Sequence, residues 1–195
     1  MTVVESSPSV TIAGCKQVEW GRPRHLLDVG LTVSGAAEPL SLVEPGELDQ
    51  GQYNARTDAF AVSAPGMLVR TDVWSRLGGT DPAGPLPAAA VDLCWRNRLA
   101  GHRVVVVPGA LIEHDGRGEG LYAGTSAVRE ASLWLRLKHA RPWAVPLLWV
   151  WGLITGIGGF AASLLAKEPG RGGAHLAGTL RTLAQRGEQA QPAGL

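Results

Sequence analysis

The feature that most constrains the fold is a run of 25 residues, 142–166, that contains no charged side chain in a chain of 195. A helix of that length would be roughly 37 Å long, and it could cross a bilayer core of about 30 Å. Trp143, Trp149 and Trp151 lie toward its start, where membrane helices carry aromatic belts. We therefore expect a transmembrane helix over 142–166. A buried core helix and a helix lying in the membrane interface are the alternatives.

The residues before this run alternate between strand and helix patterns. Short apolar, β-branched runs bounded by Gly, Pro or acidic residues predict strands at 10–13, 31–34, 40–43 and 103–107. Helix-forming runs that end at glycine cover 72–77 and 88–100, with Thr71 as the N-cap of the first. The polar, turn-rich residues 44–57 predict a long loop. This order of elements indicates an α/β domain.

We divide the chain into four parts. An α/β domain covers 1–118, an amphipathic linker helix 119–141 and the expected transmembrane helix 142–166. A basic tail covers 167–195, and its leucines 176, 180 and 183 have helical spacing.

The net charge and the two cysteines limit the kinds of ligand that we expect. The net charge is +1, and the basic residues are not gathered into one block, so we expect no nucleic-acid partner. Cys15 and Cys94 lie in apolar segments at a spacing that matches no metal-site pattern, which predicts two buried free thiols.

Three stretches carry a family resemblance. They are Ile-Ala-Gly-Cys-Lys at 12–16; Ala-Pro-Gly-Met-Leu-Val-Arg-Thr-Asp-Val-Trp at 64–74 with Leu-Gly-Gly-Thr-Asp-Pro at 77–82; and Val-Asp-Leu-Cys-Trp-Arg at 91–96 with Ala-Gly-His-Arg-Val-Val-Val-Val-Pro at 100–108, closed by His114. In this order they resemble the second half of the catalytic domain of family 2 glycosyltransferases, most closely the membrane-attached ones of actinobacteria. The resemblance implies that 1–118 is the C-terminal half of a GT-A (Rossmann-like) domain, with a parallel-rich sheet and helices on both faces.

The resemblance also implies a chemistry. A GT-A glycosyltransferase moves a sugar from a nucleotide-sugar donor to an acceptor hydroxyl. It needs a divalent cation (Mg or Mn) for the leaving diphosphate, a carboxylate base and a sugar pocket. By resemblance, His114 would complete the metal site, although a surface or capping histidine is the alternative. Ser63, Gly66, Trp95 and Arg96 would line the pocket.

The expected catalytic base is missing from its position. In the family, the segment before residue 91 begins with two adjacent acidic residues, the second of which is the base, and these positions fall on Ala89 and Ala90. Asp92 matches an acidic residue two places later. It points roughly 200° around the helix from position 90, and it could pair with Arg96 four residues on. Asp92 is therefore only a weak candidate for the base.

We therefore expect a glycosyltransferase-like protein that lacks its donor-binding half and is inactive alone. The alternatives are one half of a split transferase, whose N-terminal half another chain supplies, and a membrane-anchored, non-catalytic acceptor-binding or scaffold subunit. The expected partners are a nucleotide-sugar, a glycan or lipid-linked acceptor, and the cell membrane, with residues 1–141 on its cytoplasmic side.

Overall fold

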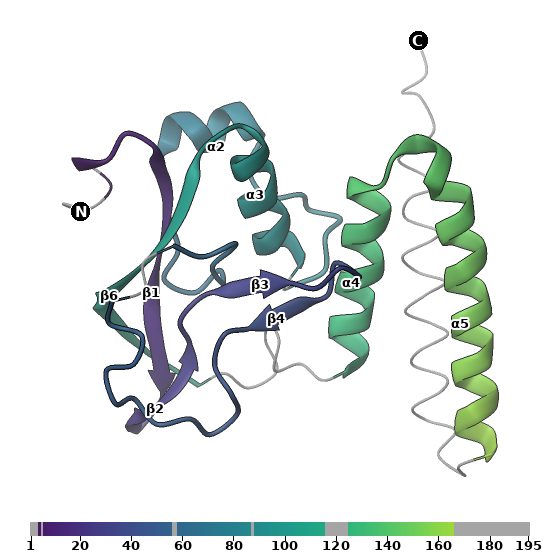
Figure 1. Cartoon of the computed structure of the whole chain (residues 1–195), viewed down its shortest axis with the longest axis horizontal. Coiled ribbons are helices and arrows are strands. Elements are labelled where there is room, and N and C mark those ends of the chain that lie inside the picture. The colour runs from purple at the N-terminus through teal and green to yellow at the C-terminus, as the bar shows by residue number, and fades with distance from the viewer. Residues whose placement is uncertain (1–3, 5, 56–57, 87, 116–124, 166–195) are drawn as a thin grey trace.

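The computed structural model describes residues 4, 6–55, 58–86, 88–115 and 125–165 (Figure 1). Most of the chain up to residue 115 forms an α/β unit, and two long helices follow it. The start of the expected linker helix, 119–124, and the expected tail, 167–195, lie outside the described residues.

Strand β1 (Val10–Glu19) is the centre of a four-stranded sheet, and all but its last residue are buried. Strand β6 (Arg103–His114) pairs with it in parallel along one edge. The other edge is shared by two antiparallel neighbours, β5 (Leu68–Val69) and β2 (Arg22–Asp28). The described sheet is therefore mixed rather than parallel-rich.

Both long strands continue past the residues at which the sequence predicted their ends. β1 runs through Gly14, where a side chain would collide with Val62, so glycine allows the neighbouring segment to approach the strand closely. β6 runs through Pro108 because the pairing register skips there, from Cys15 with Val107 to Lys16 with Leu111. A proline is tolerated at such a bulge since no ladder hydrogen bond is required of it.

The strands predicted at 31–34 and 40–43 are present as β3 (Leu31–Val33) and β4 (Pro39–Ser41), which pair antiparallel and form a hairpin. Leu31 also exchanges backbone hydrogen bonds with Ala61, at 2.8 and 3.0 Å, so the hairpin is joined to the segment that crosses Gly14.

The two predicted short helices are also present. Helix α2 (Thr71–Leu77) ends at Gly78, whose φ of +74° suits glycine, but its N-cap residue is Arg70 rather than Thr71. Helix α3 (Ala88–Leu99) is followed by Gly101, which has a φ of +86°.

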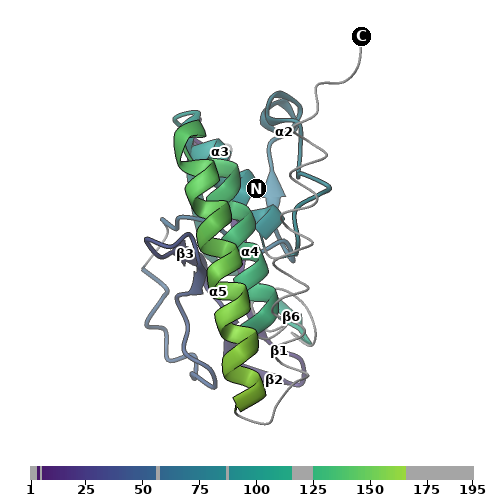
Figure 2. The same cartoon turned by 90° about the vertical axis from the view of Figure 1, so that its right-hand side faces the viewer.

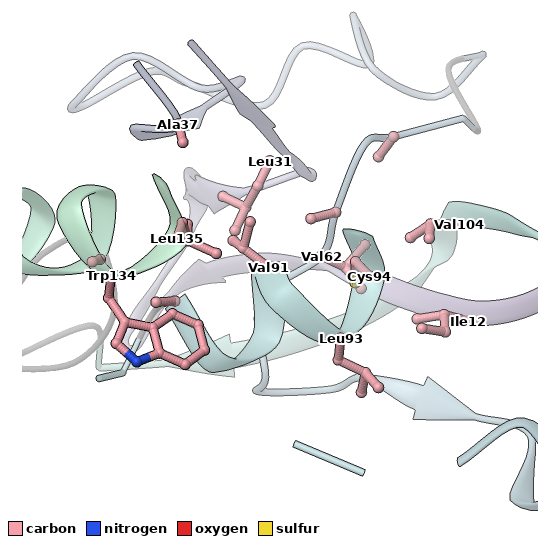
Figure 3. Close-up of a cluster of buried hydrophobic side chains, with 14 of the residues drawn as sticks. Ile12, Leu31, Ala37, Val62, Val91, Leu93, Cys94, Val104, Trp134 and Leu135 are labelled. Carbon is pink, nitrogen blue, oxygen red and sulfur yellow. The ribbon is translucent and has the colours of Figure 1, made fainter. Parts of the chain in front are cut away.

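The hydrophobic core lies between the sheet, α3 and the later helix α4 (Thr125–His139) (Figure 3). Figure 3 shows Val91 and Cys94 of α3 among side chains from the sheet, the hairpin and α4. Trp134 and Leu135 bring α4 into this core, so α4 is part of the domain rather than a free linker.

Helix α5 (Val145–Leu165) follows a short 3-10 turn, Pro142–Ala144. It lies alongside α4 on the side away from the sheet (Figures 1 and 2). An Arg129 guanidinium nitrogen on α4 donates to the carbonyl oxygen of Thr155 at 3.4 Å. Gly152 and Gly156 are buried, whereas one face of α5 exposes Leu147, Val150, Trp151, Ile154 and Ile157.

The prediction of a transmembrane helix over 142–166 is wrong. Within the part of the chain that the structure describes, no helix combines the length and the apolarity needed to cross a membrane. The uncharged run is not one continuous helix, because Pro142–Ala144 forms a separate turn and α5 begins only at Val145. Four glycines between 152 and 159 further dilute its apolar content.

Candidate functional site

The most elaborate polar arrangement surrounds Asp92, whose carboxylate on α3 has no solvent exposure. Arg96, one turn later, donates from Nε to Oδ2 at 2.8 Å. Two residues at the end of α4 complete the ring: Lys138 Nζ donates to Oδ2 at 3.0 Å, and His139 Nε2 lies 3.0 Å from Oδ1. We call these four residues the Asp92 cluster.

The ionisation of Asp92 follows from these contacts. Burial by itself raises the pKa of a carboxyl group, because the charged form loses its hydration. Hydrogen bonds from His139, Arg96 and Lys138 outweigh that penalty and lower the pKa of Asp92 to about 2. At neutral pH the carboxylate is therefore ionised, and both its oxygens are occupied.

The Asp92 cluster joins three parts of the domain. Arg96 also donates to the carbonyl oxygens of Leu77 at 2.5 Å and Gly79 at 2.7 Å, where α2 ends. Lys138 also donates to Asp81 Oδ2 at 2.5 Å. Asp92 thus holds α4 and the segment after α2 against the start of α3.

Trp95 supports the same cluster from the next position along α3. Its ring stacks on the His139 ring, with centroids 4.3 Å apart and an angle of 4° between the planes. Phe60 meets Trp95 edge-on at 5.4 Å. Three of the predicted site residues, Asp92, Trp95 and Arg96, are therefore brought together, with His139 as the common contact of Trp95 and Asp92.

Ser63 and Gly66, the two other predicted pocket residues, belong to a second polar group. Ser63 Oγ donates to Asp28 Oδ2, and Gln17 Nε2 donates to Ser63 Oγ at 3.0 Å and to the Pro65 carbonyl oxygen at 2.9 Å. Asp28 and Gln17 are buried, whereas Ser63 is half-buried. Burial raises the pKa of Asp28 to about 6, against the opposing hydrogen bond from the Gly30 amide.

Gly66 lies directly over Cys15. Its φ is +70°, and a side chain at this position would collide with the Cys15 sulfur. Glycine is therefore required at the turn that carries Ser63 and Pro65 past β1.

The expected long loop is anchored beside this group. The buried Lys16 ammonium donates to Asp49 Oδ2 at 2.8 Å and to Asn54 Oδ1 at 2.7 Å. This hydrogen bond and ion pair lower the pKa of Asp49. A buried lysine paired in this way fixes the loop against β1.

His114 lies in a third place, at the last residue of β6 and opposite Glu19 of β1. Its carbonyl oxygen accepts a hydrogen bond from the Trp20 amide at 3.0 Å. The Asp92 cluster lies on α3 and α4, so these two predicted site residues stand on different elements of the domain.

A divalent cation held by the protein alone would need a cluster of ligand side chains among the described residues. Among them, no group of three or more His, Cys, Asp or Glu side chains is close enough to hold a metal ion. The oxygens of Asp92 are already paired with a guanidinium, an ammonium and an imidazole, so a second cation there would be repelled. The ligand role of His114 stays a prediction.

Comparison with known families identifies the chain. A model of the family described as glycosyltransferase-like family 2 matches residues 1–145. The chain belongs to this family. The matched residues include all three stretches on which the resemblance was based, together with α4 and its Lys138 and His139. No curated protein matches the chain.

The sequence alone did not predict four residues that contact the candidate site. Gln17 and Asp28 belong to the group around Ser63, and Lys138 and His139 belong to the Asp92 cluster. Asp28 carried a weak signal, since it lies two residues before Gly30, a spacing at which an aspartate can accept a hydrogen bond from a turn amide. Lys138 and His139 carried none, because their contacts with Asp92 join residues 46 and 47 positions apart.

Proposed function

We propose that this family 2 member binds the acceptor when a sugar is transferred from a nucleotide-sugar to an acceptor hydroxyl, and that it does not catalyse the transfer by itself. One observation carries the proposal. The position expected for the base is Ala90, and the nearby carboxylate of Asp92 is buried in an ion cluster.

A general base must reach the acceptor hydroxyl and must gain a proton readily near the working pH. Ala90 has no group that accepts a proton. Asp92 has no solvent-exposed atom, and its pKa of about 2 makes it a weak base at neutral pH. Moving Asp92 to the surface would break its contacts with Lys138, Arg96 and His139, and the partly buried Lys138 and Arg96 would each lose a carboxylate partner.

Asp92 is therefore a positioning residue in this proposal. Through Lys138 and His139 it holds α4, and through Arg96 it holds the carbonyl groups after α2. By resemblance, Ala89 and Ala90 at the start of α3 occupy the positions of the two acidic residues in a GT-A enzyme, and the Asp92 cluster holds this helix against α4. The half-buried hydroxyl of Ser63 donates to Asp28 and accepts from Gln17, which leaves one lone pair to accept a hydrogen bond from an acceptor sugar hydroxyl.

A second candidate is a purely acceptor-binding subunit, which the loss of both acidic residues at 89 and 90 favours. The two candidates differ in what restoring the base would do. In a transferase half that has lost its base, Ala90→Asp would restore release of the nucleoside diphosphate when a chain with the donor-binding half is added. In a binding subunit it would not.

The test measures nucleoside diphosphate released from UDP-, GDP- and dTDP-sugars with Mn²⁺ or Mg²⁺. We expect no release by the chain or by Asp92→Asn. Release by the chain that is abolished in Asp92→Asn, but retained in the control Asp58→Asn, would assign Asp92 as the base and overturn the proposal. Asp58 suits the control because its ion pair with Arg103 lies on the surface.

A further inference from the structure

Trp20 occupies an unusual position for a large aromatic residue. It follows the last residue of β1, in the turn that leads to β2, and its side chain is 70 % exposed. The parallel strands β1 and β6 end side by side here, with Glu19 opposite His114. In α/β sheets, ligands bind outside the carboxyl ends of parallel strands, so Trp20 lies at the edge of the sheet that suits a ligand.

The backbone around Trp20 is held in place even though the ring is not buried. Its amide donates to the His114 carbonyl oxygen at 3.0 Å. The next residue, Gly21, has a φ of +71°, and its amide donates to Glu113 Oε2 at 3.4 Å. Val18, two residues earlier, is fully buried, so the turn rises from a packed part of the sheet. Trp20 is thus presented on a rigid base, which lowers the entropy lost on binding.

Two glutamates and one arginine lie at the turn that carries Trp20. The Glu113 carboxylate reaches the turn at Gly21, and Glu19 precedes Trp20 and pairs with Arg22 at 3.5 Å. The face of an indole ring is negative, and it attracts the partly positive C–H groups on one face of a sugar ring. Carboxylate oxygens accept hydrogen bonds from sugar hydroxyls. An exposed indole ring and a carboxylate bound to the backbone of the next residue therefore supply, within one turn, the two features by which a pyranose is recognised.

We propose that Trp20, with Glu113, forms a stacking site for a pyranose ring of the acceptor glycan. This site rests on the proposed function, because it supplies the acceptor-binding surface that the function requires. It binds the sugar by one face and by its hydroxyls, and it takes no part in chemistry. Trp20 is therefore a specificity-determining residue rather than a catalytic one.

The test follows the indole N–H signals of the seven tryptophans by NMR while methyl glycosides of glucose, galactose and mannose are added one at a time. Trp20→Phe assigns the Trp20 signal. We expect a saturable shift of this signal with at least one glycoside. The variants at position 20 lack this signal, so their binding is measured from the broadening of the glycoside's own signals. We expect about tenfold weaker binding in Trp20→Ala and partial retention in Trp20→Phe. Glu113→Gln should weaken binding without removing the stacking contact.

Trp143→Ala is the matched control, since Trp143 is 67 % exposed but lies in the turn before α5. Absence of a Trp20 shift with every glycoside, or an equal loss of binding in Trp143→Ala, would overturn the inference. So would saturable binding of tetramethylammonium in place of the glycosides, because it would make the ring and carboxylate a cation site. No nucleotide is present in this titration, so its outcome is independent of the nucleotide-sugar assay.

Discussion

Replacing Asp92 by Asn is the perturbation with the clearest expected effect. The substitution keeps the size of the side chain but removes its charge, and it leaves Lys138, Arg96 and His139 around a neutral amide. A pKa lowered from 3.8 to about 2 means that the folded state favours the ionised carboxylate by roughly 2 kcal/mol. Loss of one partner from a buried ion group adds to this, so we expect a total of about 2–4 kcal/mol at pH 7.

The pH dependence separates this effect from simple loss of packing. Because the folded-state pKa of Asp92 is depressed, its stabilisation is fully present above the unfolded value of 3.8. It is lost as the pH falls through about 2. The difference in unfolding free energy between the wild type and Asp92→Asn should therefore shrink as the pH falls from 5 toward 2.

The assay is urea unfolding followed by tryptophan fluorescence at several pH values, since Trp134 is buried and Trp95 packs against the cluster. Asp58→Asn is the matched control. It also loses an ion pair with an arginine, but that aspartate side chain is 57 % exposed, so we expect an effect of at most about 1 kcal/mol. A loss in Asp92→Asn that is no larger than that of the control, or that is the same at pH 7 and pH 2.5, would refute the reasoning.

Two further predictions concern the group around Ser63. Burial raises the pKa of Asp28 to about 6, so its neutral form stabilises the fold below pH 3.8, and this stabilisation is lost as the pH rises through about 6. Asp28→Asn should remove this pH dependence of the unfolding free energy, which amounts to up to about 3 kcal/mol. An unchanged slope of the unfolding free energy against pH, measured by urea titrations between about pH 4 and 7, would contradict this prediction. Gly66→Ala should lower the unfolding free energy by more than Gly46→Ala, because both residues have positive φ but only Gly66 faces the Cys15 sulfur; equal losses in the two variants would show that the contact is unimportant.

The sequence predicted well those helices and strands whose limits are set by neighbouring residues. The β3–β4 hairpin and helices α2 and α3 appeared close to their expected residues because glycines and apolar spacing mark their limits. The lengths of the strands were harder to predict. β1 continues past Gly14 and β6 continues past Pro108 because of pairing partners elsewhere in the chain.

The transmembrane prediction failed for a related reason. Absence of charge over 142–166 describes composition, but it fixes neither where a helix begins nor what it packs against. The break at Pro142–Ala144 and the contact of α5 with α4 are properties of the folded domain.

The candidate site was predictable only in part. The Asp92–Arg96 pair followed from the spacing of four residues on one helix, and it is present. Lys138 and His139, which contact Asp92 from α4, and the buried Asp28 behind Ser63 come from distant parts of the sequence. The match of the base position to Ala90 left Asp92 as a weak candidate for the base, and its surroundings favour a positioning role.

The most direct test of the central claim is a calorimetric titration of the purified chain with UDP-, GDP- and dTDP-sugars in the presence of Mn²⁺. The described residues contain no cluster of three or more metal-ligating side chains. If the chain binds the acceptor only, it should give no saturable heat with any of the three nucleotide-sugars. Saturable, Mn²⁺-dependent binding of one nucleotide-sugar that is lost in Asp92→Asn or His114→Ala would contradict the account, and would place the donor chemistry in this chain.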